Sequence, residues 1–419
     1  MSHSVLIDIS QLRIGMYIQL DVGWMHHPFP VSSFRVASLE QIEALRALNL
    51  AQVRYFPSKS DPVVAEGAGE PDLAHESAVV ADTSVQALRQ TFELQCQELQ
   101  TCERSFGEAT RSYQQISQAV AQQPDLARDL TAALIGSCVD ELFSHGDSVI
   151  RLLSEDVGVR SAQHPVNVMV LCLLLGRALA LPNQALRELG TAALLHDLGK
   201  QALPLHVSEP YAHLSAGDLQ RYRSHVGESV ALAERMRLPV SVVTAIAQHH
   251  ERTDGSGFPL SLLGEDLGQH GQILALVNHY DRLCNPSHGC EALTPHEALS
   301  VMFAQCQSKF DPVLLGAFIR MMGVYPPGSV VQLVNDGYAI VVSVNSSRPL
   351  RPRIVLHDPQ VPKEQALVLD LEHAPELAIR RSLRPAQLPR DVLDYLSPRK
   401  RVCYFFERAV GLGATEAGA

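Results

Sequence analysis

The sequence predicts a mainly α protein that begins with a small α+β domain and ends in a small β unit. Near the N-terminus, apolar and polar residues alternate with the period of a half-buried strand. From residue 77 to about residue 324, apolar residues recur at helical intervals between Gly, Pro and Ser signals. After Pro326 the β-branched runs VVQLV, YAIVVSV and RIVLH replace this pattern. The largest of the three parts is therefore expected to be helical.

The N-terminal domain is expected at residues 1–57. Apolar residues alternate with polar ones from Val5 to Ile9 and from Met16 to Leu20, which predicts two strands. A short helical pattern follows at Leu39, Ile42, Leu45 and Leu48, and residues 52–56 have the pattern of another strand. Residues 58–76 are polar and rich in Gly and Pro, so we expect a linker there.

Residues 77–144 are expected to form a helical connector. Its apolar residues Leu88, Phe92, Leu99 and Phe106 recur at roughly helical intervals, which predicts an amphipathic helix. Residues 77–125 then have two interpretations of about equal weight. The helix either joins two copies in a homodimer or is a solvated helix that lies on the next domain.

The helical domain is expected at residues 145–325 and a C-terminal β extension with a tail at 326–419. Two helix starts are clear, because Ser215 and Thr294 each stand three residues before an acid. The stretch from Val166 to Leu181 is apolar but interrupted, and is too short for a membrane span. We expect it to be a buried helix, with no membrane insertion.

The composition excludes some functions. A net charge of −11 argues against a protein that follows duplex nucleic acid by bulk attraction, although a metal site could still attract a small anion. The eight cysteines form no CxxC pair and are expected to be reduced thiols. The N-terminus lacks the basic and apolar regions of a signal peptide, so the cytoplasm is the expected location.

Histidines and an aspartate in the helical domain predict a metal site. They occur at His164, in the pair His196-Asp197, at His225 and in the pair His249-His250. Imidazole and carboxylate groups from several helices can meet in one pocket, and one carboxylate can bridge two metal ions. Lys200 follows Asp197 by one helical turn, where its ammonium group can reach an anionic substrate.

Each motif also has an ordinary structural interpretation. A single histidine such as His164 or His225 is more often a packed or capping residue than a ligand. The pair His249-His250 is harder to explain by packing, because DGSGFP follows it, and its glycines and proline require a special backbone.

Taken together, the motifs resemble the HD-GYP family, a branch of the HD phosphohydrolases. They are His164, HDLGK at 196–200, His225 and HHERTDGSGFP at 249–259, in that order. Residues 1–57 also resemble a small domain of unknown function that often precedes HD-GYP domains in bacteria. The resemblance implies an all-α core that uses two divalent metal ions, iron or manganese, to hydrolyse cyclic di-GMP to pGpG or GMP. It further implies signalling partners such as a diguanylate cyclase.

The resemblance also implies a role for each matching position. One metal ion has the ligands His164, His196 and Asp197, and the second has His225, His249 and His250. Asp197 bridges the two ions, and Lys200 contacts the substrate phosphate, so these two residues are the expected catalytic groups. Asn278 stands at the family's last ligand position. The substrate-binding loop comprises Asp254, Gly255, Gly257, Phe258 and Pro259.

Four positions depart from the family pattern. Asn278 replaces an aspartate, although Asp281 one turn later is another candidate. Arg160 replaces a glutamate associated with a third metal ion, Phe258 replaces a tyrosine, and CNPSHGC replaces a basic segment. A second function therefore stays open, that of a regulatory module with weak or no catalysis that binds nucleotide or a partner protein.

Overall fold

The computed structural model describes residues 4–21, 27, 29, 31–48, 50–61, 76–144, 148–209, 214–286, 291–345, 348, 350–374 and 377–408. Most of the expected linker at 58–76 lies outside these residues. The chain divides into two compact units. Unit 1 contains Met1–Gln97 and Val355–Leu369, and unit 2 contains Glu98–Ile354 and Asp370–Ala419.

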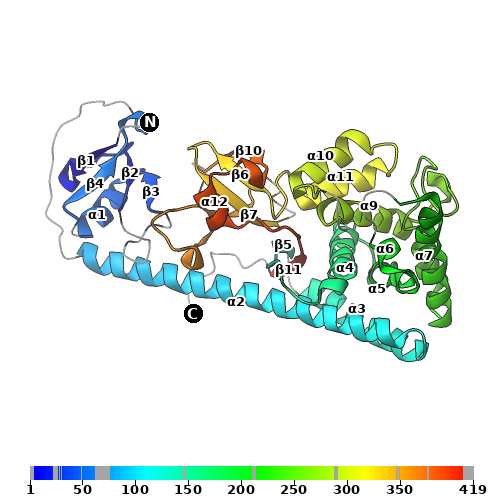
Figure 1. Cartoon of the computed structure of the whole chain (residues 1–419). Coiled ribbons are helices and arrows are strands. Elements are labelled where there is room, and N and C mark those ends of the chain that lie inside the picture. The colour runs from blue at the N-terminus through cyan, green and yellow to red at the C-terminus, as the bar shows by residue number, and fades with distance from the viewer. Residues whose placement is uncertain are drawn as a thin grey trace. The chain divides into compact units, whose positions relative to one another are not determined.

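Unit 1 has an antiparallel sheet with the order β1-β4-β2-β3. Its strands are β1 (Val5–Asp8), β2 (Tyr17–Gln19), β3 (Ser33–Arg35) and β4 (Gln52–Tyr55), and helix α1 spans Leu39–Ala47 (Figure 1). Ser38 caps α1 by accepting a hydrogen bond from the Gln41 amide. Ile18, Leu20 and Leu45 are fully buried between the sheet and the helix. The expected α+β fold of this region is confirmed.

A segment from late in the sequence completes unit 1. Strands β8 (Arg353–Leu356) and β9 (Val368–Asp370) pair with each other. Between them, the Asp358 carboxylate accepts a hydrogen bond of 3.0 Å from the Ser32 amide. Val361 and Leu367 are buried against Leu88 and Phe92. The sequence pattern had placed these residues only in a C-terminal β extension, because no local signal marks which core a strand joins.

The expected connector consists of two helices, α2 (Glu76–Ala119) and α3 (Pro124–Ser144). Within unit 2, α2 buries a stripe of residues spaced three or four apart, namely Cys102, Phe106, Ala109, Tyr113, Ile116 and Val120. Phe106 meets Phe405 edge-on, with ring centroids 6.4 Å apart. This part of α2 therefore buries its apolar face within unit 2, which agrees with the interpretation that the helix lies on the next domain. Dimerisation through residues 77–125 stays a prediction.

The helices of unit 2 surround a buried central helix, α4 (Arg160–Ala178), which packs against α5 and α9 (Figure 1). The others are α5 (Asn183–Leu195), α6 (Leu205–Ser208), α7 (Ala216–Arg235), α8 (Val240–Gln248), α9 (Gln269–Cys284), α10 (Pro295–Gln305) and α11 (Pro312–Met322). Ser215 caps α7 and Thr294 forms a capping box at α10, as expected. Among the described residues, no helix has the length and apolar character needed to cross a membrane.

The C-terminal strands of unit 2 share one sheet with a strand that precedes α4. The sheet has the path β10-β6-β7-β5-β11. Along this path lie β5 (Ser148–Leu152), β6 (Val330–Leu333), β7 (Tyr338–Asn345), β10 (Ile379–Leu383) and β11 (Tyr404–Arg408). β8 and β9 belong to the same sheet off the path, and α12 (Arg390–Leu396) lies between β10 and β11 in the chain. Tyr404 donates its amide hydrogen to Asn167 on α4, and its hydroxyl lies 3.1 Å from that of Tyr280 on α9. The end of the chain thus braces two helices of the expected metal site.

Candidate metal centre

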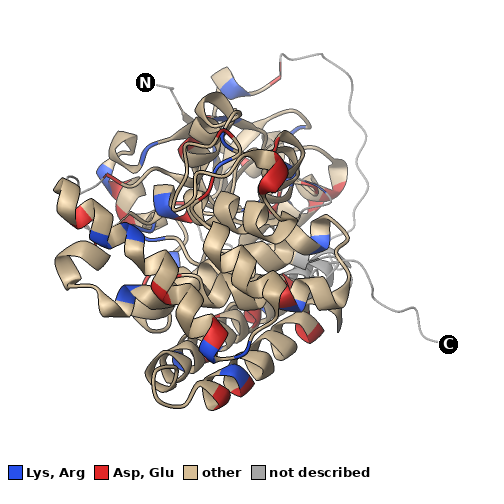
Figure 2. Cartoon of the chain, turned by 90° about the vertical axis from the view of Figure 1, so that its right-hand side faces the viewer, with Lys and Arg blue, Asp and Glu red and all other residues tan. Residues whose placement is uncertain are grey.

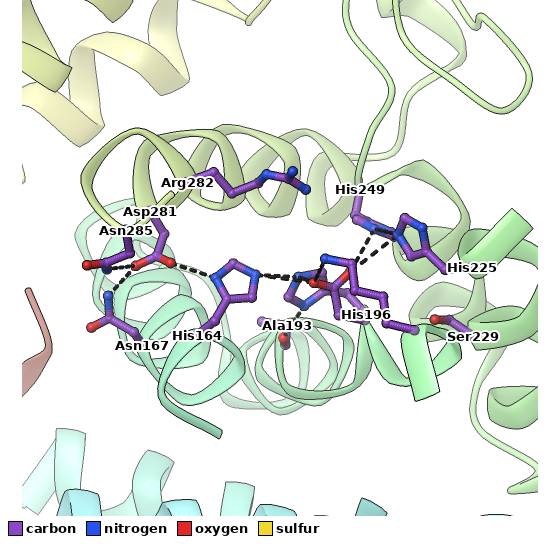
Figure 3. A network of polar contacts seen from close by, with 12 residues as sticks. His164, Asn167, Ala193, His196, His225, Ser229, His249, Asp281, Arg282 and Asn285 are labelled. Carbon is purple, nitrogen blue, oxygen red and sulfur yellow. Dashed lines mark hydrogen bonds and ion pairs between the residues drawn. The ribbon is translucent and has the colours of Figure 1, made fainter. Parts of the chain in front are cut away.

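The predicted ligands come from separate helices and meet at one place (Figure 3). His164 lies in the first turns of α4, and His225 lies in α7. His196 ends α5, and Asp197 follows it directly at the start of a 3-10 turn, Leu198–Ala202. His249 ends α8, and His250 comes next. Helix ends and buried helix faces thus present the side chains to a common interior.

Gly199 allows two of these elements to approach closely. A Cβ atom at this position would lie 2.2 Å from the backbone oxygen of His225 and 2.6 Å from the amide nitrogen of Ser229. The Gly199 amide instead donates a 2.8 Å hydrogen bond to the Ser229 hydroxyl. The glycine of the HDLGK motif therefore lets α7 bring His225 up to Asp197.

The Asp197 carboxylate divides the histidines into two groups. Its Oδ2 atom lies 3.3 Å from Nε2 of His164 and 3.4 Å from Nε2 of His196. Its Oδ1 atom lies 3.3 Å from Nε2 of His225 and 3.6 Å from Nε2 of His249. With His250 added to the second group, the ligand atoms of each group lie within 4.8 Å of one another. This is the arrangement in which one carboxylate bridges two metal positions.

Hydrogen bonds fix which ring nitrogen of each histidine is available. Nδ1 of His196, His225 and His249 each meets the backbone oxygen three residues earlier, so Nδ1 carries the proton and donates it. The Nε2 atoms then hold lone pairs. The Nε2 atoms of His225 and His249 lie 3.2 Å apart, and those of His164 and His196 lie 3.3 Å apart. Lone pairs that face each other this closely, beside a carboxylate, fit a shared cation, either a proton or a metal ion.

Asp281 supports His164. Its Oδ2 atom lies 2.6 Å from Nδ1 of His164. Its Oδ1 atom accepts hydrogen bonds from the amides of Asn167 and Asn285, the latter at 2.9 Å. Both oxygens are engaged, and the side chain is fully buried. Asp281 therefore orients a ligand, as carboxylates often do for metal-bound histidines, and does not replace Asn278.

The ionisation of most of the cluster suits metal ligands. His164 differs, because burial alone would lower its pKa, but its hydrogen bonds to Asp197 and Asp281 outweigh burial and raise it. Burial holds the pKa of His196, His249 and His250 below its usual range, so these rings are neutral at physiological pH. Burial alone would raise the pKa of Asp197, but the charges of Lys200 and His196 and the hydrogen bonds from His164 and His225 together outweigh it and hold that pKa well below its usual range. Nζ of Lys200 contacts Oδ2 of Asp197. Neutral imidazoles and an ionised carboxylate are the protonation states that bind metals.

Three buried polar atoms at the centre make no hydrogen bond. They are Oδ1 of Asp197, Nε2 of His250 and Oδ1 of Asn278. Buried polar atoms without partners are uncommon in folded proteins and call for a missing ligand. All three can donate an electron pair to a metal ion. The residues therefore fit a divalent ion with mixed nitrogen and oxygen ligands.

A cavity of about 200 Å³ adjoins the cluster. His249, His250 and Asn278 line one side of it, so Asn278 faces the same space as two predicted ligands. The remaining lining comes from aromatic, charged and small side chains, namely Tyr222, Glu251, Arg252, Phe258, Ala275, His279, Arg282 and Phe310. The cavity combines positive charge with ring surfaces, which suits an anion attached to a ring.

The loop DGSGFP contributes one side chain to this cavity, Phe258, whose ring stacks on His250 with centroids 4.4 Å apart. Asp254 is exposed, and its carboxylate accepts from the Ser256 amide at 3.0 Å in a local turn. Gly255 has a φ of 75°, and a Cβ on Gly257 would lie 2.4 Å from Cα of Glu251. The glycines thus shape the loop. Substrate contacts by Asp254, Gly255, Gly257 and Pro259 stay predictions.

Sequence reasoning missed two residues. The buried carboxylate of Glu251 accepts hydrogen bonds from the amides of Leu260 and Leu262, at 2.7 and 3.1 Å, and so anchors the loop. Its position directly after His250 was the available signal. Arg282 lines the cavity although it follows Asp281 in a helix without any motif of its own. Only the three-dimensional packing of α9 reveals its position.

Two parts of the chain match the sequence models of known families. Residues 143–314 match the sequence model of a family described as HD domain, and residues 4–130 match a domain of unknown function, DUF3391. These two parts of the chain are thus similar to the HD domain and to DUF3391. The expected resemblance to HD-domain proteins is confirmed, and the match to a domain of unknown function runs from residue 4 to residue 130, past the expected end at residue 57.

Three curated relatives are cyclic di-GMP phosphodiesterases. One from Pseudomonas aeruginosa is 28% identical over 355 residues, which cover 83% of this chain and 84% of the relative. One from Borreliella burgdorferi is 25% identical and covers 46% of this chain and 50% of the relative. A response regulator from Xanthomonas campestris is 32% identical over 35% of this chain and 39% of the relative. The chain therefore spans most of the first relative and half or less of the other two.

A solved structure of an HD-GYP-type protein from Bdellovibrio bacteriovorus has a TM-score of 0.43 and 17% identity, and covers 75% of this chain and 98% of that chain. A similarity at this level is too weak to assign a fold.

Proposed function

We propose that this protein is a metal-dependent phosphodiesterase that hydrolyses cyclic di-GMP to pGpG, GMP or both. The main observation behind the proposal is the convergence of four Nε2 atoms on the two oxygens of Asp197. The likeness to cyclic di-GMP phosphodiesterases over most of the chain supports the choice of substrate.

The centre is proposed to hold two divalent ions, with iron or manganese as the expected metals. His164, His196 and Asp197 would hold one ion, and Asp197, His225, His249 and His250 would hold the other, with Asn278 as a further oxygen ligand. Such ions lower the pKa of a bound water and stabilise negative charge on phosphoryl oxygens. The protein's part is to fix the ligand geometry through the Nδ1 hydrogen bonds and Asp281.

Lys200 is proposed to bind the scissile phosphate. In the structure its ammonium group contacts Asp197, beside the position where the phosphate would meet the centre. A lysine there would offset the negative charge that develops on phosphorus-bound oxygens during hydrolysis. Phe258 is proposed to pack on a substrate ring, because its own ring lines the cavity.

Local charge, not the charge of the whole chain, would attract the substrate. The net charge is −11, and basic and acidic residues are interspersed along the described helices in Figure 2. Positive charge close to the cluster comes from Lys200 and from the arginines that line the cavity, Arg252 and Arg282. Homodimerisation, signalling partners and a cytoplasmic location are further expectations that stay predictions.

The direct test is hydrolysis of cyclic di-GMP by purified protein loaded with iron or manganese under reducing conditions. Chromatography would follow pGpG and GMP, and elemental analysis would measure the bound metal. We expect turnover by the natural protein, and loss of both metal and turnover in Asp197→Ala. Asp140→Ala, which alters an exposed carboxylate on α3, is the control. Absence of turnover from protein with confirmed metal occupancy would refute the proposal.

The second candidate is a regulatory module with weak or no catalysis. Asn278 favours it, because a neutral amide at this position leaves the centre with one negative charge fewer than an aspartate would. Asn278→Asp distinguishes the two functions. If Asn278 is a ligand in a weakened enzyme, the aspartate should raise metal affinity or turnover. If the variant binds metal more tightly but still shows no turnover, the regulatory function is favoured.

A further inference from the structure

We propose that Arg282 is a phosphate-binding residue of the cavity, and that its guanidinium group holds a phosphodiester oxygen of the substrate beside the metal centre. This inference rests on the proposed function and adds a contact that no motif in the sequence assigns. It concerns a phosphate ester as the ligand, whatever bases that ester carries.

The position of Arg282 is the first support. It follows Asp281 on α9, and its side chain points from that helix toward the side of the cluster where His249 lies (Figure 3). The guanidinium donates to the Tyr222 hydroxyl and lies 5.4 Å from the centre of that ring. Tyr222 therefore holds the group in place at the wall of the cavity.

The balance of charge is the second support. The ammonium group of Lys200 has a carboxylate partner in Asp197, but no carboxylate of a described residue lies within 4.0 Å of the Arg282 guanidinium. The carboxylate of Glu251 also lines the cavity, yet it is bonded to the loop amides of Leu260 and Leu262. Arg282 thus places a positive charge at the cavity wall that forms no direct ion pair with a described carboxylate, although the charges of Asp197 and Asp281 act on it from farther away.

Asn278 is the third and independent support. It lies on α9 one turn before Arg282, is 1% exposed, and lines the same cavity. Its Oδ1 atom has no hydrogen-bond partner. The free Oδ1 atom of Asn278 and the guanidinium of Arg282, which has no direct ion-pair partner, line the same cavity. We infer that the ligand of this cavity has both a cationic and an anionic part. A metal ion with a bound phosphate group has this composition.

The chemistry of the cavity selects a phosphate ester. A guanidinium group can bind phosphate oxygens through two parallel hydrogen bonds, and the one carboxylate in the cavity lining, Glu251, is bonded to loop amides instead of to Arg282. Tyr222, Phe258 and Phe310 supply ring surfaces around it. The opposing interpretation is that Arg282 only packs on Tyr222. The two interpretations differ in whether loss of the charge weakens phosphate binding.

The test is calorimetry with inorganic phosphate and with cyclic di-GMP on metal-loaded protein, comparing the natural chain with Arg282→Gln and Arg282→Lys. Each variant is also analysed for bound metal. Arg223→Gln is the matched control, because that guanidinium lies 5.2 Å from the centre of the Phe258 ring and Arg223 is not among the residues that line the cavity.

We expect Arg282→Gln to weaken phosphate binding about 10- to 100-fold, the range expected for loss of a charge-assisted contact, with unchanged metal content. Arg282→Lys keeps the charge and should give an intermediate affinity. Arg223→Gln should bind phosphate like the natural chain. An unchanged phosphate affinity in Arg282→Gln would overturn the proposal. So would a phosphate affinity in Arg282→Lys that is as low as in Arg282→Gln.

The two proposals fail in different ways. If the natural chain binds phosphate through Arg282 but does not hydrolyse cyclic di-GMP, the proposed function fails and the role of Arg282 stands. If it hydrolyses cyclic di-GMP and the Arg282→Gln variant has the same KM and phosphate affinity, the role of Arg282 fails alone.

Discussion

At the scale of single residues, the two nitrogens of each ring have separate tasks. Nδ1 of His196 donates to the Ala193 carbonyl, which leaves Nε2 to face Asp197. His225 and His249 repeat the same i−3 contact at the ends or inside faces of other helices. This recurrence explains how ligands from different helices keep one tautomer without a dedicated partner for each. His164 is the exception, because its Nδ1 meets a side chain, Asp281.

Asp281→Asn tests that exception. The amide would keep the size of the side chain but could no longer offer two carboxylate oxygens, so His164 would be oriented less firmly. Loss of such a supporting contact typically weakens metal binding about 10- to 100-fold. Competition with a metal-sensitive dye would measure the affinity, and Asp140→Asn, at an exposed position of α3, is the control. Equal metal affinity in Asp281→Asn and the natural chain would show that Asp281 does not support the centre.

At the scale of elements, the close approach of α7 to the HDLGK turn positions the bridge. Gly199, in the 3-10 turn, leaves room for the α7 backbone, whereas Gly227, within α7 itself, has nothing within 4 Å of a Cβ position. A side chain at Gly199 would therefore clash with neighbouring backbone, whereas a side chain at Gly227 would meet open space. Their substitution separates the effect of contact from the effect of helix propensity.

We expect Gly199→Ala to destabilise the fold by about 2 kcal/mol or more and to reduce bound metal, because the added methyl group would push His225 away from Asp197. Gly227→Ala should be neutral or stabilise the fold by about 0.5–1 kcal/mol, because alanine favours a helix interior. Denaturant unfolding and elemental analysis give the two readouts. Matching stability and metal content in both variants would contradict the packing account.

The sequence allowed the meeting of the histidines and Asp197 in one place to be predicted, because the motifs that carry them are short and local. HDLGK and the HHE pair each fix a helix end, and the helical pattern places His164 and His225 inside helices. The role of Asp281 could not be predicted, since its partners Asn167 and Asn285 are brought to it by the packing of α4 on α9. Arg282 escaped notice for the same reason. Contacts between different helices or strands do not produce a periodic pattern in the sequence.

At the scale of the whole molecule, segments late in the sequence belong to the same sheets and cores as much earlier segments, which the expected domain boundaries do not show. The region 326–419 was expected to be a separate β extension, yet β7 and β11 pair with β5, which precedes the site helices. Residues 355–369 belong to unit 1. Strand pairing between distant segments is set by the whole core, which explains why strands were recognisable in the sequence while their partners were not.

A fragment covering residues 145–325 should therefore fail to unfold cooperatively. It would retain β5 but lose both neighbouring strands, and Asn167 and Tyr280 would lose their contacts with Tyr404. A fragment covering residues 98–419 keeps these contacts and should give a single sharp thermal transition. Circular dichroism on heating compares the two. A cooperative transition of similar midpoint in the shorter fragment would show that the sheet is dispensable.

The central claim is that Asp197 bridges metal ions held by the histidines around it. Anomalous X-ray diffraction from crystals of the full chain loaded with manganese or iron tests it most directly. The account predicts metal peaks within coordination distance of Oδ1 and Oδ2 of Asp197, with Nε2 atoms of the histidines as neighbours. Metal that binds the protein but gives no peak beside Asp197 would contradict the account.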